Sequence, residues 1–180
     1  MIGNNQQEWK TLSSNVAFKG KRLTVLHDKV LLPNGEQGEY EYIKKKDYIL
    51  IIPATDTSFF LVEQYRYPVK KRMLEFPQGA ALENESEEVA AKRELEEEIG
   101  LQAGRITFLG RVDMGKGSST QGCHVFLAQE LIRGEQNLDN TEQDMIIREI
   151  SKNEIKEMIK QGKISDSATL SAYSLLFSHQ

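Results

Sequence analysis

Runs of branched and aromatic residues alternate with clusters of turn-forming residues along most of the chain, and this pattern predicts a protein rich in β-strands. The Asn34-Gly35 pair predicts a hairpin turn between the first two runs. The polar segment Thr55–Ser58 predicts another turn between the next two. The predicted strands are Arg22–Leu32, Gly38–Ile43, Asp47–Pro53, Ser58–Gln64, Met73–Phe76, Ile106–Asp113, His124–Gln129 and Met145–Ile150.

Three segments have the character of helices. Ser86–Ile99 consists of strong helix formers without internal Gly or Pro, and Gly100 follows it as a C-cap. Towards the end of the chain, the pattern also predicts helices at Lys152–Lys160 and Ser167–Phe177. Together the elements predict the α/β (α+β) class, with a mixed sheet flanked by one central helix and by C-terminal helices.

The central helix carries an unusual set of acids. Ala91, Leu95 and Ile99 are spaced four apart and predict an apolar stripe that packs on the sheet. Beside it, Glu94, Glu97 and Glu98 share one face, and their carboxylates repel one another unless a cation compensates. Two interpretations follow from these charges alone: a solvated helix face, or a site for Mg²⁺, which prefers oxygen ligands.

Composition limits the classes of protein and of site. The formal net charge of −4 over 180 residues argues against nucleic-acid binding, which needs a basic surface. The longest apolar run, Tyr48–Ala54, is too short to cross a bilayer, and the N-terminus shows no secretory signal. One cysteine and three scattered histidines exclude a disulfide within the chain and a Cys/His metal cluster. We therefore expect a cytoplasmic protein without a membrane or nucleic-acid partner, in which oxygen atoms hold any metal.

The acidic helix lies within a longer motif. From Gly79 to Leu101 the chain is GAALENESEEVAAKRELEEEIGL, which fits Gly, five residues, Glu, seven residues, Arg-Glu-apolar-any-Glu-Glu-any-Gly-apolar without departure. This segment resembles the Nudix box, the signature of the Nudix hydrolases, and it has the strand–loop–helix context that such a motif requires. The resemblance implies a Nudix-type α/β/α sandwich and hydrolysis of a nucleoside diphosphate linked to another moiety.

The same resemblance implies roles for individual residues. Glu94, Glu97 and Glu98 are the expected metal ligands, together with the backbone carbonyl of Gln78, and the expected cofactor is Mg²⁺ with Mn²⁺ as the alternative. Gly79, Glu85 and Arg93 are expected to support the motif, because in the family the Arg–Glu pair holds the loop and the helix together.

The residues before the motif resemble the ADP-ribose pyrophosphatase branch. These are Val62–Arg66 and Leu74–Gly79. Arg66 is expected to bind phosphate in a bidentate way and Glu75 to contact substrate; the alternatives are a surface cation and a solvated acid. After the motif, Lys116 stands where the branch usually has proline. Gly117 there is expected to let the backbone approach the ligand.

The general base is expected outside the motif. In this branch it is often a Glu on a late loop, and Glu142, two residues before Asp144, fits that spacing. The alternatives are that Glu142 is simply a solvated acid, and that Glu97 or a metal-activated water takes this role.

Residues 1–45 are expected to form a small antiparallel β-sheet that builds a homodimer, as in similar enzymes, and residues 46–180 the Nudix hydrolase domain. Trp9 has two interpretations: it stacks on an adenine base, or it packs at the dimer interface.

The function expected from the resemblance is Mg²⁺-dependent hydrolysis of ADP-ribose or a similar nucleoside diphosphate sugar, a small-molecule nucleotide substrate. The products are a nucleoside monophosphate and a sugar phosphate. Within the enzyme class, the alternatives are GDP-mannose, a dinucleoside polyphosphate or an RNA 5′ end. Outside it, the alternatives are a non-catalytic nucleotide-binding Nudix module and an acidic structural helix without metal.

Overall fold

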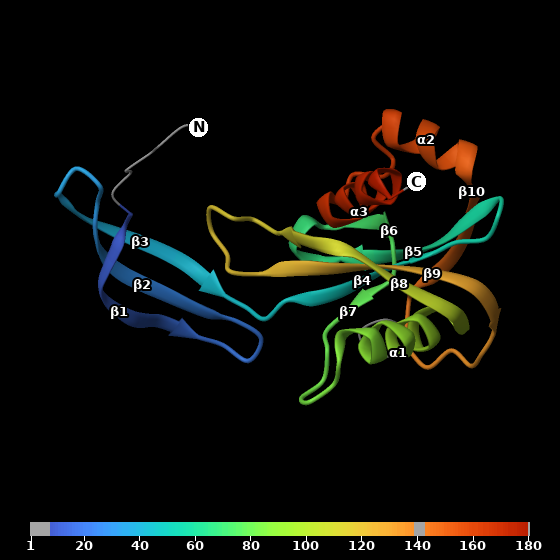
Figure 1. Ribbon diagram of the computed structural model, residues 1–180, viewed down its shortest axis with the longest axis horizontal. Helices are drawn as coiled ribbons and strands as arrows, with labels where there is room; N and C mark the ends of the chain where they lie inside the picture. The colour runs from blue at the N-terminus through green and yellow to red at the C-terminus, as the bar shows by residue number, and fades with distance from the viewer. Residues whose placement is uncertain (1–7, 139–142, 180) are drawn as a thin grey trace. The chain divides into compact units, whose positions relative to one another are not determined.

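Each run predicted as a strand forms one in the computed structural model, which describes residues 8–138 and 143–179 (Figure 1). The chain divides into two units. Unit 1 comprises Met1–Lys46 and Asp113–Gln121, and unit 2 comprises Asp47–Val112 and Gly122–Gln180.

Unit 1 is a three-stranded antiparallel sheet. Its strands are β1 (Lys10–Lys19), β2 (Thr24–Leu31) and β3 (Gln37–Lys44), in the order β1-β2-β3. The hydrophobic pattern predicts no strand at β1, because this strand is exposed along its whole length and two register shifts interrupt its alternation. The second segment of unit 1, Asp113–Gln121, is bonded to β3. The Ile43 N–H donates to the Ser118 carbonyl at 2.8 Å.

Unit 2 is built on a mixed sheet, as predicted. In the order β7-β4-β9-β8, strand β4 runs parallel to β9 and antiparallel to β7. A second sheet, ordered β10-β5-β6, is antiparallel. The strands of unit 2 are β4 (Tyr48–Pro53), β5 (Ser58–Arg66), β6 (Lys71–Glu75), β7 (Gln78–Gly79), β8 (Leu101–Asp113), β9 (Gly122–Arg133) and β10 (Ile146–Ser151).

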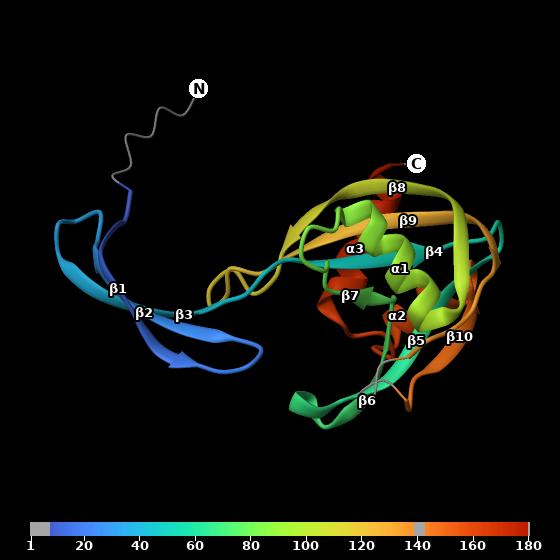
Figure 2. The same ribbon diagram turned by 90° about the horizontal axis from the view of Figure 1, so that it is seen from below.

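The predicted helices are confirmed, with ends that agree to within one residue. They are α1 (Glu87–Ile99), α2 (Lys152–Lys160) and α3 (Ser167–Ser178), and a short 3₁₀ turn, η1 (Tyr67–Val69), joins β5 to β6. Helices α1 and α3 cover opposite faces of the mixed sheet (Figures 1 and 2). Among the described residues, no helix is long and apolar enough to cross a membrane.

The core explains why α1 lies where it does. The predicted stripe is buried: Ala91 and Leu95 are fully covered, and they pack with Ile49 and Ile51 of β4 and with Phe126 of β9. Burial of this apolar surface is the main force that holds the helix on the sheet. The face of α1 beside the stripe is thereby fixed against the edge of the sheet.

Candidate functional site

Helix α1 has well-defined ends. Ser86 caps the first turn, because its hydroxyl accepts a hydrogen bond from the Val89 N–H at 3.3 Å. Gly100 ends the helix in the left-handed region at φ 63°, where glycine is favoured. These caps set the position of the acidic face between them.

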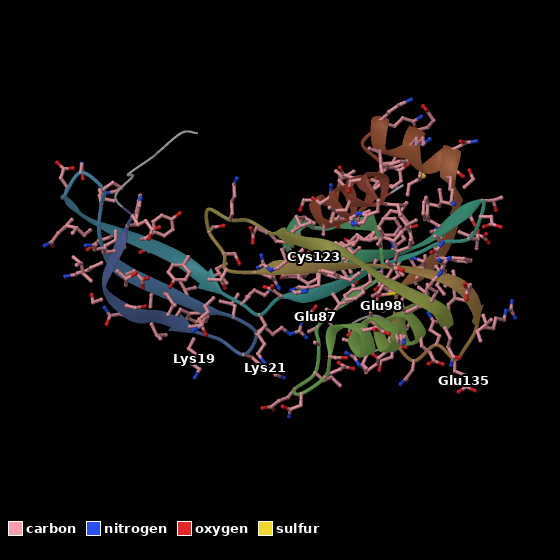
Figure 3. All side chains as sticks on the ribbon, in the orientation of Figure 1. Lys19, Lys21, Glu87, Glu98, Cys123 and Glu135 are labelled. Carbon is pink, nitrogen blue, oxygen red and sulfur yellow. The ribbon has the colours of Figure 1, made fainter. Side chains whose placement is uncertain are left out.

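The three candidate ligands on α1 lie at different depths. Glu98 is 1% exposed and Glu94 is 9% exposed, whereas the side chain of Glu97 is 38% exposed. In Figure 3, Glu98 lies on the side of α1 that faces the sheet, and Glu87 marks the other end of the helix. Burial of a carboxylate is costly without compensation, so the surroundings of Glu94 and Glu98 have to supply donors or positive charge.

Arg93 supplies much of that charge. One of its guanidinium nitrogens, Nη1, donates to Glu94 at 2.8 Å and to Glu97 at 2.7 Å. The remaining nitrogens donate to both oxygens of Glu85 at 2.9 Å and to the carbonyl of Ala80 at 3.0 Å. Arg93 therefore ties the loop before α1 to the helix face that carries the carboxylates.

The contacts between Arg93 and Glu85 shift the pKa values of both groups. Hydrogen bonds from Arg93 lower the pKa of the Glu85 carboxyl below its usual value, against the opposing effect of burial. The pKa of Arg93 is raised in turn, chiefly by its bonds to Glu85. Both groups are charged at neutral pH.

The strand before α1 comes very close to the acidic face. A Cβ atom added to Gly79 would overlap Cδ of Glu94, so any side chain at this position would displace this carboxylate. At the preceding residue, the Gln78 N–H donates to Oε2 of Glu98 at 3.1 Å. The backbone of β7 therefore lies in direct contact with the buried carboxylates of Glu94 and Glu98.

Arg66 and Glu75 are brought together by the pairing of β5 with β6. Glu75 is 1% exposed, and both of its oxygens lie 3.0 Å from Nε of Arg66. Gln78 Nε2 donates to the same carboxylate at 2.6 Å. Burial pulls the pKa of Arg66 down, but the hydrogen bonds and the charge of Glu75 outweigh this effect and raise it. The two residues therefore bind each other, which sequence spacing alone did not indicate.

The donor set of α1 fits a hard divalent cation, because every candidate ligand offers oxygen. Within residues 8–138 and 143–179, no three His, Cys, Asp or Glu side chains are gathered into a group that can hold an ion as they stand. Glu94 and Glu97 are turned towards Arg93. Ligation by all three glutamates therefore requires these side chains to rotate from Arg93 towards a common point.

Gly117, a predicted substrate contact, lies in unit 1 together with Trp9, which was expected at an adenine base or at the dimer interface. The carbonyl of Gly117 accepts a hydrogen bond from the Tyr40 hydroxyl at 2.8 Å, and Trp9 meets the Tyr40 ring edge-on at 5.9 Å between centroids. Trp9, Tyr40 and Lys116 line an open pocket of about 440 Å³. Unit 1 therefore has an aromatic pocket of its own.

The predicted base Glu142 lies outside the described residues. Its neighbour two positions later is well defined: Asp144 accepts from Arg72 Nη1 at 2.6 Å through its carboxylate and from Nη2 at 2.8 Å through its carbonyl. Asp144 therefore forms an ion pair with Arg72 of β6.

One charged cluster in unit 2 was missed by the sequence analysis. Asp47 accepts from Arg111 Nε at 2.6 Å, from the Gly122 N–H at 2.6 Å and from His124 Nε2 at 3.1 Å. The hydrogen bond from Arg111 is the largest of the influences that lower the pKa of Asp47, to about 2. The partners are far apart in sequence and come together only through strand pairing, so no local signal marks them.

A domain profile described as "NUDIX domain" matches residues 44–169, and one described as "Nucleoside diphosphate sugar hydrolase N-terminal domain" matches residues 9–43. The chain is 29% identical to the ADP-ribose pyrophosphatase of Bacillus subtilis (strain 168) over 172 residues, which covers 94% of this chain and 92% of that protein. It is 30% identical to the methanol dehydrogenase activator of Bacillus methanolicus over 171 residues, with coverage of 94% and 92%.

A solved structure described as "Crystal structure of ADP compounds hydrolase" has the same fold. The TM-score is 0.88 at 21% sequence identity, and the match covers 97% of this chain and 95% of that chain. This similarity supports the assignment of the α+β architecture.

Proposed function

Because the chain belongs to the Nudix hydrolase family, with a domain match over residues 44–169, we propose that it hydrolyses the pyrophosphate bond of ADP-ribose or a similar nucleoside diphosphate sugar. The products are a nucleoside monophosphate and a sugar phosphate. The observation that carries the proposal is the set of carboxylates on one face of α1: Arg93 binds those of Glu94 and Glu97, and the Gln78 N–H binds that of Glu98. The relative named ADP-ribose pyrophosphatase supports the substrate class.

The cofactor that we propose is Mg²⁺, with Mn²⁺ as the alternative. Glu94, Glu97 and Glu98 would hold it through their carboxylates and Gln78 through its carbonyl, since all four donors are oxygens. When bound, such an ion neutralises charge on a pyrophosphate and makes a water a better nucleophile.

Arg66 is proposed to bind a substrate phosphate. Glu75 accepts from Nε and Nη2 of its guanidinium, and within the described residues no acceptor is bonded to Nη1. A half-buried guanidinium held on one edge presents its free edge in a defined direction, which favours phosphate binding. Because Arg66 and Gln78 occupy the carboxylate of Glu75, we propose that Glu75 acts on the substrate through these two neighbours.

For the proton transfer we keep Glu142 as the proposed general base, with Glu97 as the alternative. Asp144, two residues after Glu142 in the sequence, is bound by Arg72 in an ion pair.

Unit 1 is proposed to form a homodimer. Gly117 is proposed to let the backbone approach the ligand, and Trp9 either to pack at the dimer interface or to stack on an adenine base. Val16 and Phe18 of β1, and Trp9 just before it, are each more than half exposed, and exposed apolar side chains favour an interface. We propose the cytoplasm as the site of action, because the one cysteine of the sequence, Cys123, is a buried free thiol.

Release of AMP from ADP-ribose tests the proposed function. We expect AMP and ribose 5-phosphate in the presence of Mg²⁺ and none in the presence of EDTA. Glu98→Gln should lower turnover by about 100-fold or more while far-ultraviolet circular dichroism stays unchanged. Glu88→Gln is the matched control, because this exposed residue of the same helix pairs only with the exposed Lys92 among the described residues.

Two other outcomes would each change one part of the proposal, either the substrate or the metal ligands. Release of GMP from GDP-mannose without AMP from ADP-ribose would keep the reaction and change the substrate. Undiminished turnover by Glu98→Gln would contradict the ligand assignment.

A further inference from the structure

The segment that follows β9 lies along the C-terminal end of α1, and we name Gly134–Leu138 the α1 clasp. The Gly134 N–H donates to the Gly100 carbonyl at 2.9 Å, and the Asn137 N–H donates to the Glu97 carbonyl at 3.0 Å. The side chain of Gln136 donates through Nε2 to the Glu98 carbonyl at 2.7 Å. One short segment therefore binds the carbonyls of Glu97, Glu98 and Gly100 at the end of the helix, and the first two of these residues are candidate metal ligands.

The end of α1 needs such donors for a physical reason. The last four carbonyls of a helix have no partner within it, and the negative end of the helix dipole lies there. In α1 this end also carries Glu96, Glu97 and Glu98, and its last turn contains no basic residue. Negative side chains at this end weaken the helix, so donors from another segment stabilise its final turn.

Close packing fixes the position of the α1 clasp against the end of the helix. A Cβ on Gly100 would lie 3.2 Å from the Gln136 nitrogen, and one on Gly134 would lie 2.6 Å from Oε1 of Glu96. Figure 3 labels Glu135 beside the end of α1, where its N–H lies 3.4 Å from the same Glu96 oxygen. Leu138 packs against the core cluster that contains Leu95. The clasp is therefore anchored on both sides of Gln136.

We propose that Gln136 is a positioning residue for the metal site. Its amide holds the carbonyl of Glu98 and so fixes the turn from which Glu97 and Glu98 project. This inference rests on the proposed function, which assigns these two glutamates to the metal. Gln136 is not a catalytic residue, because it acts through the backbone of α1. Groups that position a ligand without touching the metal commonly change metal affinity by 10–100-fold when they are replaced.

Replacement of Gln136 by methionine tests the role of its amide. Methionine has nearly the same length but no N–H donor. We expect Gln136→Met to bind Mn²⁺ about tenfold more weakly, measured by electron paramagnetic resonance, with a similar rise in the Mg²⁺ concentration for half-maximal activity. Because Gln136 is exposed, the midpoint of thermal unfolding should change little. Gln136→Asn, whose amide is one methylene too short, should weaken Mn²⁺ binding similarly.

Gln102→Met is the matched control. Gln102 Nε2 donates at 2.6 Å to the side chain of Glu96 at the same helix end, and the proposal gives Glu96 no metal role. We expect this variant to bind Mn²⁺ as the wild type does. Wild-type affinity in both Gln136 variants would overturn the inference, and so would an equal loss of affinity in Gln102→Met. Failure of the wild type to release any nucleotide would instead contradict the proposed function, since Mn²⁺ binding is measured without turnover.

Discussion

At Gly79 the backbone of β7 leaves no room for a side chain beside the Glu94 carboxylate. Gly79→Ala should displace this carboxylate, which is the flexible end of its side chain, and leave the fold intact. We expect Mg²⁺-dependent turnover to fall by about tenfold or more, because a ligand candidate loses its position. Gly38→Ala is the control, since a Cβ there makes only ordinary contacts, the nearest at 3.5 Å. Unchanged turnover in Gly79→Ala would show that Glu94 does not need this close approach.

Asp47 provides a prediction about pH. Its pKa is lowered from 3.8 to about 2 in the folded protein, first by Arg111 and against the effect of burial. A lowered folded pKa contributes stability above the unfolded pKa, and this contribution is lost as the pH falls from about 4 to about 2. Because the carboxylate is partly exposed, we expect Asp47→Asn to cost about 1 kcal/mol at pH 7.

Urea unfolding at two pH values checks this prediction. The difference in free energy of unfolding between the wild type and Asp47→Asn should be largest at pH 7 and clearly smaller near pH 2, where about half of the wild-type carboxyls in the folded protein are protonated. A difference that stays constant over this range would mean that the charge of Asp47 is not its source.

At the scale of one element, α1 depends on its buried stripe and not on its charged face. Leu95 is fully buried between the helix and the sheet. We expect Leu95→Ala to lower the free energy of unfolding by about 2–5 kcal/mol. Lys92→Ala, which removes only an exposed pair with Glu88, should change it by less than about 0.5 kcal/mol. Denaturant titration of both variants measures this contrast, and equal losses would contradict it.

Elements also differ in how well the sequence predicts them. Helix α2 has its predicted ends, because its cap and its periodicity are local properties of the chain. Strand β1 was not predicted from its hydrophobic pattern, since it covers no core and its alternation is broken by two register shifts. The two-residue strand β7 has no signal of its own, because its pairing with β4 alone defines it.

At the scale of the whole molecule, the proposed homodimer is the feature to measure. Sedimentation equilibrium should give about twice the 20.5 kDa of the chain. Val16→Glu should shift the protein towards the monomer, because it places a charge on the exposed apolar surface of β1 without touching the core. A mass of one chain at all concentrations would contradict the dimer.

The sequence by itself determined the elements and the identity of the acidic face. The Nudix-box spacing, the apolar stripe and the caps of α1 are set by residues within 23 positions of one another, so they can be recognised without a structure. The mixed sheet also followed from the order and type of its elements.

Only the tertiary structure decided which charges meet. Arg66 pairs with Glu75, Asp144 with Arg72, and Gln136 with the end of α1, across separations of 9 to 72 residues. Each of these contacts depends on strand register and on the path of a loop, and a single residue's slip along a strand would reverse the side on which its side chain lies. The sequence therefore identified the expected metal ligands and Arg93, whereas the groups outside the motif that contact this helix became visible only in the folded chain.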